Sequence, residues 1–560
     1  MPERWYKEAV IYCLDVETFQ DSNADGIGDL QGLIARLDYL ARLGVTCLWL
    51  NPVHPSPMRD DGYDVAGYYD VHPRIGSLGD FAELVHEASN RGIRILIDLV
   101  VNHTSDQHPW FKAARSDPQS RYRDWYVWSE TEPPDRRQGM VFPGQQTETW
   151  TYDKVARAWY FHRFYDFEPN LNHANPEVQR EIRKIVGFWL QLGVSGFRMD
   201  AAPFLIEIPH AEGLKPRQEF DILTHLTEYM NWRQGNAVIL AEANVDNDQL
   251  SKFFGDVGGS GNRLHMLFDF RLNAKLMLAL AREEADPIVQ TLMTMPHIPP
   301  TGQWATFLRN HDEVDLSRLT PHEREDVFKA FGPDPRMQLY DRGIRRRLAP
   351  MLGGDRARIE MAYSLQFTLP GTPVLRYGEE IGMGEDLTLK ERDAIRTPMQ
   401  WFSGLNAGFS SAPPARLVRP VVSTGTYGYK KVNVTSQRLD GESLLLWFER
   451  MIRTLRECPE VGTGTGSVVE TNAPPEVLVH RFEGPDGSML FLHNLGRHPA
   501  TIDIGPLPGA CDDQHEVFAD RPYPPFKKSL KGLELAARGY RWIRLCHKLT
   551  NSSAHATERG

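Results

Sequence analysis

Short runs of apolar residues alternate along this chain with longer segments in which apolar residues recur at helical spacing. Residues 93–101 are apolar almost throughout, as a strand buried on both faces of a parallel sheet requires. In residues 30–43, by contrast, Leu30, Leu33, Leu37 and Leu40 lie on one face of a predicted helix. Strands are predicted at residues 9–16, 47–53, 93–101, 196–202, 237–242, 265–270, 304–309 and 373–377. Further helices are predicted at residues 78–88, 176–192, 216–233, 356–369 and 443–456.

This alternation predicts an α/β fold in which eight parallel strands close into a (β/α)8 TIM barrel. It fails at residues 104–172, a long irregular segment rich in Trp, Pro, Asp and Arg, which predicts an inserted domain after the third strand. Residues 466–547 show short alternating runs between turn residues, which predict a C-terminal antiparallel β-sandwich. The barrel is then expected to comprise residues 1–103 and 173–465. The polar tail, residues 548–560, is expected to be disordered.

Four predicted strands end in polar side chains that a barrel would bring to one face. Arg198 and Asp200 are two positions apart and therefore project from the same side of their strand. Taken alone, a buried structural salt bridge accounts for this pair equally well. The carboxyl ends of barrel strands meet at a single reaction centre, however, and three other ends carry similar groups. They are Asn102-His103, Glu242-Ala243-Asn244 and Asn310-His311-Asp312-Glu313.

In this order and spacing, the four strand ends resemble the signature regions of the α-amylase superfamily, glycoside hydrolase family 13. The resemblance covers nearly the whole chain, and it implies a barrel with an inserted domain B. It also implies a retaining reaction on an α-glucoside, with two carboxylates flanking the bond that breaks. Asp200 matches the nucleophile, Glu242 the acid/base, and Asp312 the third carboxylate, which grips sugar hydroxyls. We expect Arg198 to keep Asp200 ionised, and the apolar surroundings of Glu242 to raise its pKa.

The resemblance also implies a set of substrate-binding residues. His103 and His311 match donors to hydroxyls of the same sugar ring. In the run Asp60-Asp61-Gly62-Tyr63-Asp64, Tyr63 would stack under the ring and Asp60 would bind its outer hydroxyls. Arg396 would pair with Asp60 and close the pocket around one terminal glucose. Without the resemblance, a core aromatic is the more usual interpretation of Tyr63.

Residues 21–29 carry oxygen side chains at alternate positions around a glycine turn, a spacing that suits a hard divalent cation. Gly32 stands where a calcium loop has its bidentate Glu, and a turn rich in Asp and Asn without an ion explains the pattern equally well. The chain resembles oligo-1,6-glucosidases and trehalose synthases, which hold a metal here. This favours a structural Ca²⁺, or Mg²⁺, without an organic cofactor. The candidate ligands are Asp21, Asn23, Asp25, Ile27 and Asp29.

Charge and composition limit the classes of molecule that this protein is expected to bind. The net charge is −11 and the basic cluster at residues 345–347 is short, so nucleic-acid binding is not expected. No apolar run is long enough to span a bilayer, and residues 1–6 lack the apolar core of a signal peptide. The five cysteines form no CxxC pair, and Cys13 and Cys47 are expected in the core. We therefore expect a cytoplasmic protein, compatible with a homo-oligomer, that binds a small α-glucoside and neither nucleic acid nor membrane.

Several motifs bear on which member of the family the chain resembles. Residues 331–337, 343–350 and 377–384 are similar to trehalose synthase, the maltose–trehalose isomerase. Glu17 departs from the family, which has Arg in a Val-Arg-Ser-Phe run, and residues 267–273 lack the usual run of the isomerase. Asn170 replaces a carboxylate that helps to bind a second cation near Asn102 and Glu207, so a second cation site there is left open.

Three functions remain as alternatives. The first is isomerisation or transglucosylation of maltose or a similar small α-glucoside, and the second is hydrolysis of such a glucoside by an α-glucosidase. The third, from another class, is a catalytically inactive barrel that serves as a binding or scaffold protein. Inactive relatives carry a membrane anchor and have lost catalytic carboxylates, whereas this chain has Asp200, Glu242 and Asp312.

Overall fold

Eight parallel strands close into a barrel in the computed structural model of this chain. The structure describes residues 4–208, 217–255, 261–484, 487–505, 507, 514–525 and 530–546. All eight predicted barrel strands are confirmed, and each is paired with its neighbours in parallel. Around the barrel they are β1 (Ile11–Leu14), β2 (Cys47–Leu50), β3 (Arg94–Leu99), β7 (Gly196–Met199), β10 (Val238–Ala241), β11 (Met266–Phe268), β12 (Gln303–Phe307) and β16 (Thr372–Arg376).

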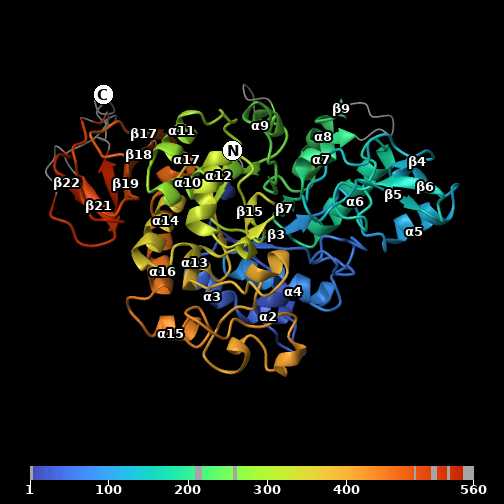
Figure 1. Cartoon of the computed structure of the whole chain (residues 1–560), viewed down its shortest axis with the longest axis horizontal. Helices are drawn as coiled ribbons and strands as arrows, with labels where there is room; N and C mark the ends of the chain where they lie inside the picture. The colour runs from blue at the N-terminus through green and yellow to red at the C-terminus, as the bar shows by residue number, and fades with distance from the viewer. Residues whose placement is uncertain are drawn as a thin grey trace, which may run out of the picture.

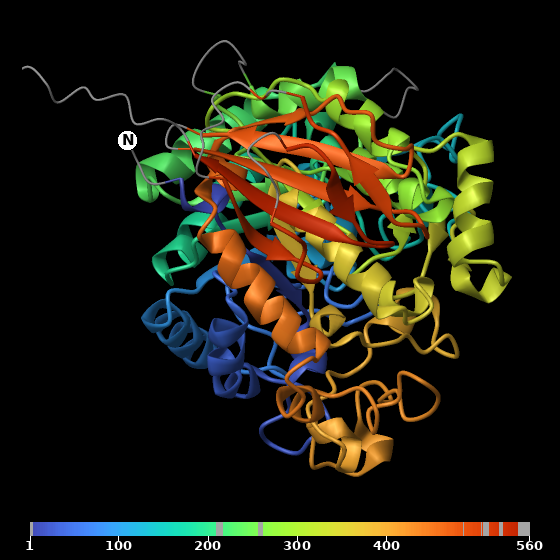
Figure 2. The ribbon, with the colours of Figure 1, turned by 90° about the vertical axis from the view of Figure 1, so that its left-hand side faces the viewer.

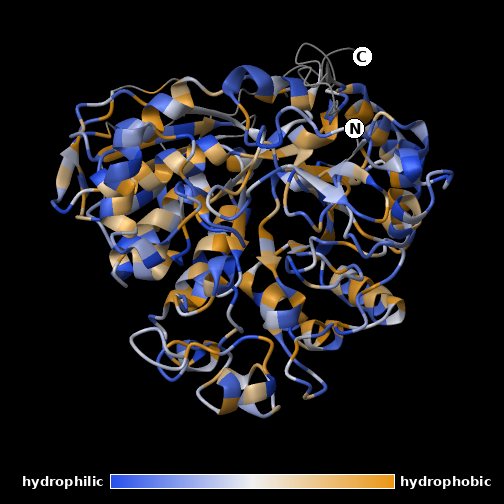
Figure 3. Ribbon diagram, turned by 45° about the vertical axis from the view of Figure 1, so that its right-hand side comes forward, coloured by the Kyte–Doolittle hydropathy of each residue, from blue (hydrophilic) through white to orange (hydrophobic). Residues whose placement is uncertain are grey.

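Amphipathic helices surround the barrel, and their ribbons show both hydrophobic and hydrophilic positions (Figure 3). Helix starts are capped as the sequence allows, for example by Ser77, which forms a capping box with Asp80. The side chain of Ser443 likewise accepts a hydrogen bond from the amide of Leu446. The main helices are α4 (Leu78–Asn90), α6 (Pro176–Gln191), α8 (Asp221–Arg233), α10 (Phe270–Arg282), α12 (Pro321–Phe331), α14 (Arg356–Thr368) and α16 (Leu444–Arg456).

One predicted helix is divided in two. Residues 30–43 form α2 (Leu30–Ala35) and α3 (Leu37–Leu43), with Arg36 between them in a non-helical conformation. The guanidinium of Arg36 lies 4.0 Å from the ring centre of Trp401, and its Nε donates to Gln20 at 2.8 Å. Arg36 thus contacts residues distant in the sequence at the point where the helix is interrupted. The helical spacing of apolar residues does not reveal this interruption.

Side chains that alternate along the strands fill the barrel interior. The inner cluster includes Cys13, Trp49, Leu96, Leu240 and Phe307, and Cys47 belongs to it as well. The expected core positions of Cys13 and Cys47 are therefore confirmed. The same alternation turns Asp98, two residues after Leu96, toward the barrel axis at the carboxyl end of β3.

The inserted segment lies on one side of the barrel (Figure 1). It contains α5 (Pro109–Ser116) and a three-stranded antiparallel sheet of β4 (Trp128–Ser129), β6 (Ala158–Phe161) and β5 (Trp150–Asp153). Its aromatic rings pack on each other: Phe111 lies against Trp128 with ring centres 5.6 Å apart. Phe111 belongs to the large core cluster that includes the outer side of the barrel, and Trp128 packs against it, so these contacts join the segment to the barrel core.

The C-terminal part lies on the opposite side, and its main sheet crosses in front of the barrel in Figure 2. The predicted β-sandwich is confirmed, because apolar residues of the five-stranded sheet and of a two-stranded sheet share one cluster. The predicted tail, residues 548–560, lies outside the described residues. The five strands are β17 (Thr465–Val468), β18 (Val477–Glu483), β19 (Gly487–Asn494), β23 (Tyr540–Cys546) and β21 (His515–Ala519), and the two are β20 (Ala500–Ile502) and β22 (Leu533–Leu535).

Residues 402–439 form a mostly irregular segment at one end of the molecule, around α15 (Val434–Arg438) (Figure 1). Trp401 attaches the start of this segment to the N-terminal part of the barrel, with its ring centre 5.2 Å from that of Phe19. The segment thereby brings Arg419 close to the carboxyl end of β1. In the part of the chain that is described, none of the helices has the length and apolar character needed to cross a membrane.

Candidate active site

The carboxyl ends of several barrel strands surround a cavity of about 410 Å³. Asp98 of β3 and Arg198 of β7 are partners across the sheet, and Leu240 of β10 pairs with Arg198 on its other side. Glu242 follows Leu240 by two positions and therefore projects toward the same face. The predicted site residues that line the cavity are Asp60, Tyr63, His103, Asp200, Glu242, His311 and Asp312.

The guanidinium of Arg198 joins three carboxyl groups. Its Nη1 lies 2.8 Å from Oδ1 of Asp98 and 2.6 Å from Oδ1 of Asp200. Its Nη2 donates to Oε2 of Glu242. The side chain of Arg198 is only 2% exposed, and a cation buried to this degree is tolerable only with such partners. Asp200 and Glu242 are therefore held close together on one fixed cation.

Glu242 has the protonation that an acid catalyst needs. Burial raises the pKa of Glu242 to about 8, although Arg198 acts in the opposite direction. This confirms the direction predicted from its apolar surroundings. Burial likewise raises the pKa of Asp98 to about 7, against the effect of Arg198. At neutral pH the carboxyl group of Glu242 therefore carries a proton that it can donate.

Asp312 has the opposite environment. Its Oδ1 lies 3.1 Å from Nη1 of Arg392 and 3.0 Å from Nη2 of Arg396, and its Oδ2 lies 3.2 Å from Nε2 of His311. Burial acts to raise the pKa of Asp312, but the guanidinium groups of Arg392 and Arg396 outweigh it and place the pKa below its ordinary value. The cavity thus contains an ionised Asp312 and a protonated Glu242, a separation of roles typical of acid–base catalysis.

Tyr63 and the two histidines form a second group on the cavity wall. The rings of Tyr63 and His311 are stacked with centres 5.6 Å apart, and the Tyr63 hydroxyl lies 2.7 Å from Nε2 of His311. Nε2 of His103 lies 3.2 Å from the Tyr63 carbonyl oxygen. Burial lowers the pKa of His103 to about 4 and also lowers the pKa of His311. Both imidazoles are neutral at pH 7, so each has one donor and one acceptor nitrogen. Both nitrogens of His103 contact protein groups, the Tyr63 carbonyl and the Asn102 amide.

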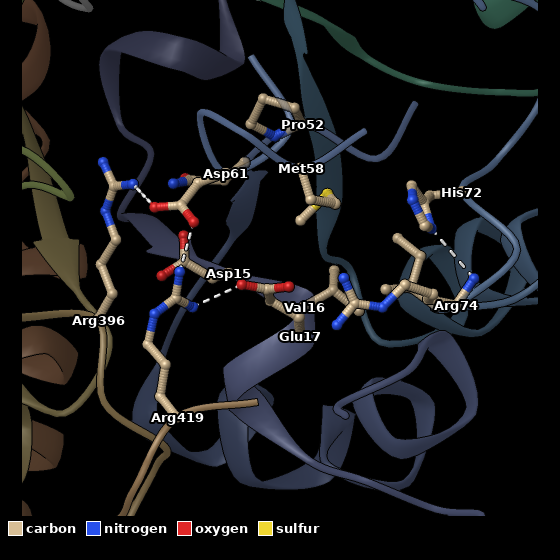
Figure 4. Close-up of a pocket in the computed structure, with 12 residues that line it drawn as sticks. Asp15, Val16, Glu17, Pro52, Met58, Asp61, His72, Arg74, Arg396 and Arg419 are labelled. Atoms are coloured by element: carbon tan, nitrogen blue, oxygen red, sulfur yellow. Dashed lines mark hydrogen bonds and ion pairs between the residues drawn. The ribbon is translucent and has the colours of Figure 1, made fainter. Parts of the chain in front are cut away.

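The expected pairing of Arg396 with Asp60 is wrong, because Arg396 pairs with Asp61 (Figure 4). Nη1 of Arg396 donates to Oδ2 of Asp61, while Nη2 of Arg419 donates to Oδ1. Asp61 has a φ of 47°, in the left-handed region that non-glycine residues seldom adopt, and from this turn it faces both guanidinium groups. Asp60 lines the main cavity instead, where burial raises its pKa to about 7.

A second, small cavity of about 30 Å³ lies where Asp61, Arg396 and Arg419 meet (Figure 4). Arg419 also donates to Oε1 of Glu17 at 2.5 Å and lies 2.8 Å from Oδ1 of Asp393. The sequence identified Glu17 as a departure from the family but did not indicate its partner. The structure shows that the carboxylate of Glu17 binds the guanidinium of Arg419, which also binds Asp61.

Several residues of the site were missed by sequence reasoning. Arg392 lines the cavity and contacts both Asp312 and Glu313, with its Nε 2.9 Å from Oε2 of Glu313. Its position four residues before Arg396, in the same polar run, was the available signal. The cavity also has an aromatic wall, and the sequence did not show which of many rings would reach it. This wall comprises Phe142, Phe164, Phe204 and Phe270.

The predicted cation loop offers hard oxygen donors, but these side chains already bind the backbone of the loop. Asp21 accepts from the amides of Asn23 and Ala24 through Oδ1 and from that of Gly26 through Oδ2. Asn23, Asp25 and Asp29 accept from other amides of the same region. Over the described ranges, no group of three or more His, Cys, Asp or Glu side chains is arranged to hold a metal. A cation at this loop therefore stays a prediction.

The second cation site, near Asn102 and Glu207, is closed by protein side chains. Nδ2 of Asn170 donates to Oδ1 of Asn102 at 3.1 Å, and Oδ1 of Asn170 accepts from the amide of Arg163 at 2.6 Å. Nη2 of Arg163 lies 3.0 Å from Oε2 of Glu207 and neutralises it. With two amides and a carboxylate already paired to a guanidinium, these residues do not fit a divalent cation.

Comparison with known proteins gives consistent results. Residues 13–330 and 344–463 match the model of the α-amylase catalytic domain. The chain is 42% identical over 554 residues to the trehalose synthase/amylase TreS of Mycolicibacterium smegmatis, covering 97% of this chain and 92% of that protein. It is 31% identical over 519 residues to an oligo-1,6-glucosidase of Parageobacillus thermoglucosidasius, covering 85% and 87% of the two chains. Among solved structures, the α-amylase from H. orenii superimposes with a TM-score of 0.76 at 27% identity, covering 96% of this chain and 99% of that one.

Proposed function

This chain belongs to the α-amylase family, glycoside hydrolase family 13, and we propose that it transfers an α-glucosyl group with retention through a covalent intermediate on Asp200. The observation that carries this proposal is the guanidinium of Arg198, which binds Asp200 and the protonated Glu242 together. Two carboxyl groups on one guanidinium fit the separation of roughly 5–5.5 Å found in retaining enzymes better than the wider gap of inverting ones.

In the first step, an oxygen of Asp200 attacks the anomeric carbon of the glucosyl unit. The glycosidic bond breaks, and its oxygen leaves with the proton of Glu242. Arg198 supports this step, since it binds Oδ1 of Asp200 at 2.6 Å and orients the nucleophile. Asp312 remains ionised among its cations and can bind two hydroxyls of the sugar ring as an acceptor.

In the second step, a hydroxyl oxygen attacks the same carbon. Its proton passes to the Glu242 carboxylate, and the ester bond to Asp200 breaks, which restores both carboxyl groups. If the attacking oxygen belongs to water, the product is glucose. If it is the anomeric hydroxyl of a glucose retained in the cavity, the product is trehalose. The two reactions share the intermediate and differ only in what attacks it.

We favour isomerisation of maltose, or of a similar small α-glucoside, over hydrolysis. The similarity to trehalose synthases extends over almost the entire chain, at higher identity than the similarity to oligo-1,6-glucosidases. The cavity is of moderate size, and residues of the inserted segment line part of it. Hydrolysis of small α-glucosides is the second candidate, supported by the oligo-1,6-glucosidase relatives. Location in the cytoplasm and the oligomeric state stay predictions.

The products from maltose decide between the two reactions. The protein is incubated with maltose, and the sugars are resolved by NMR at early times, before secondary reactions accumulate. Trehalose as the main early product supports the isomerase. Glucose as the sole product, or no consumption of maltose, contradicts it and leaves hydrolysis of another α-glucoside as the better description.

A further inference from the structure

The carboxylate of Asp61 is shared by two guanidinium groups that come from different parts of the chain (Figure 4). Its Oδ2 accepts from Nη1 of Arg396, and its Oδ1 accepts from Nη2 of Arg419. The side chains of Arg396 and Arg419 are only 3% and 9% exposed, so both cations need carboxylate partners in a buried setting. Burial acts to raise the pKa of Asp61, but Arg396 and Arg419 outweigh it and lower the pKa. Asp61 is therefore an ionised bridge between the two cations.

Arg396 in turn holds Asp312, the carboxylate expected to bind hydroxyls of the sugar ring. Its Nη2 lies 3.0 Å from Oδ1 of Asp312, and its Nε donates to the carbonyl oxygen of His311 at 2.9 Å. The two terminal nitrogens of Arg396 thus serve two different carboxylates, those of Asp61 and Asp312. A guanidinium often forms a bidentate pair instead, in which both terminal nitrogens bind one carboxylate. Arg396 keeps a nitrogen for Asp312 because one oxygen of Asp61 is already taken.

Arg419 takes that oxygen, although it belongs to the irregular segment 402–439. Two further carboxylates fix its guanidinium: Nη1 donates to Oε1 of Glu17 at 2.5 Å, and Nε donates to Oδ1 of Asp393 at 2.9 Å. Arg419 lines the small cavity and not the main one. Its influence on a bound sugar therefore passes through Asp61 and Arg396.

Position 17 offers a second route by which a cation could reach Asp61. Glu17 and Asp61 bind the two terminal nitrogens of the same guanidinium, so their carboxylates lie next to each other around the small cavity. The family has Arg at this position, and an Arg side chain is longer than that of Glu. In this chain a carboxylate stands at position 17, and Arg419 supplies the cation instead.

We propose that Arg419 is a positioning residue for sugar binding and takes the place of the Arg that the family has at position 17. It occupies one oxygen of Asp61, so that Arg396 is left to hold Asp312. This inference rests on the proposed function, in which Asp312 binds the glucosyl ring. Without Arg419, both oxygens of Asp61 become available to Arg396, whose guanidinium then turns away from Asp312 into a bidentate pair. The nucleophile and the acid lie outside these ion pairs and keep their places.

The test compares Arg419→Ala with the wild type at a temperature at which both are folded. We measure kcat and KM for the release of nitrophenol from 4-nitrophenyl α-glucoside, together with the inhibition constant of glucose. We expect KM and the inhibition constant each to rise roughly ten-fold, the scale of one lost hydrogen bond to a charged group. A merely structural role would reduce the number of active molecules, and hence kcat, but would leave KM unchanged. Arg416→Ala, an exposed change in the same segment, is the matched control and should alter neither constant.

A second pair of variants tests whether the cation itself is what matters. Glu17→Arg in the Arg419→Ala background returns a guanidinium to the small cavity, and we expect it to bring both constants back close to the wild-type values. Glu17→Ala in the same background removes the carboxylate without adding a cation and should not restore them. A raised KM that Glu17→Arg does not reverse, or that Glu17→Ala reverses equally well, overturns the proposal.

Unchanged constants in a folded Arg419→Ala protein also overturn it. If that variant does not fold, Arg419→Gln, which keeps much of the side-chain length but carries no charge, replaces it in every comparison. A wild type that releases no nitrophenol contradicts the proposed function and not the positioning, which the crystal structure of the variant then decides. Both terminal nitrogens of Arg396 on Asp61 support the proposal, and an unchanged contact between Arg396 and Asp312 overturns it.

Discussion

Nη1 of Arg419 lies 2.5 Å from Oε1 of Glu17, and the two residues are 402 positions apart in the chain. Burial raises the pKa of Glu17, with Arg419 acting in the opposite direction. Arg419 also binds Asp61, which in turn holds Arg396 next to Asp312. Three successive ion pairs thus connect Arg419, in the irregular segment 402–439, to the carboxylate of Asp312 in the candidate active site.

Removing the guanidinium group of Arg419 is expected to destabilise the fold. Arg419→Ala leaves the carboxylates of Glu17 and Asp61 with fewer partners in a buried setting, where breaking an ion pair costs about 3–5 kcal/mol. Denaturant unfolding of both proteins measures the difference. Arg416→Ala is the control, since Arg416 is exposed on the same segment and should change stability by less than about 0.5 kcal/mol. Equal losses in the two variants would show that the buried network contributes nothing.

The nucleophile is tested with Asp200→Ala. This variant lacks the oxygen that forms the bond to the anomeric carbon, so turnover of an aryl α-glucoside should fall to background. The exposed Asp248→Ala variant should retain full activity. Wild-type turnover by Asp200→Ala would refute the assignment of Asp200. Full binding without turnover in the wild type itself would favour the inactive scaffold.

The acid role of Glu242 is tested by the leaving group. Glu242→Gln keeps the shape of the side chain but has no acidic proton, and a loss of ~10²–10⁴-fold is expected where the leaving oxygen needs protonation. Aryl glucosides with good leaving groups need less assistance, so their first step should be partly spared. Steady-state and burst kinetics with a series of aryl α-glucosides measure this. A uniform loss across the series argues against an acid role.

The pH profile provides a further check on Glu242. Because burial raises the pKa of Glu242 to about 8, the protonated form that can act as an acid is present below that value and is lost as pH rises through it. We therefore expect kcat/KM for maltose to decline above about pH 8. For an aryl glucoside with a good leaving group the decline should be weaker. Identical alkaline limbs for both substrates would assign the titration to another group.

The cation loop is tested by chelation. If an ion is bound by Asp21, Asn23, Asp25, the carbonyl of Ile27 and Asp29, removing it should lower the melting temperature, because a ligand of the native state adds stability by mass action. Asp25→Ala should melt lower than the wild type and should not respond to the chelator. An unchanged melting curve for the wild type, with no metal found by elemental analysis, would leave the turn held by its own hydrogen bonds.

Local patterns along the chain were enough to predict the barrel and the side chains that converge in it. Period-2 alternation placed Arg198 and Asp200 on one face, and Glu242 and Asp312 follow the ends of apolar runs. These predictions depend on local patterns and on one general rule, that the carboxyl ends of parallel barrel strands meet. The direction of the Glu242 pKa shift was accessible for the same reason, because apolar neighbours along the strand already indicate burial.

The pairing of side chains across the site could not be predicted from such local patterns. Asp61 rather than Asp60 binds Arg396, because a left-handed turn at Asp61 sets the direction of its carboxylate. Arg392 reaches Asp312 from a loop that has no periodic pattern. The hydroxyl of Tyr165 likewise meets that of Tyr340, which is 175 positions away in the chain. Strand and helix periods are local properties of the chain, whereas these contacts depend on the paths of irregular loops, which are set only when distant segments pack together.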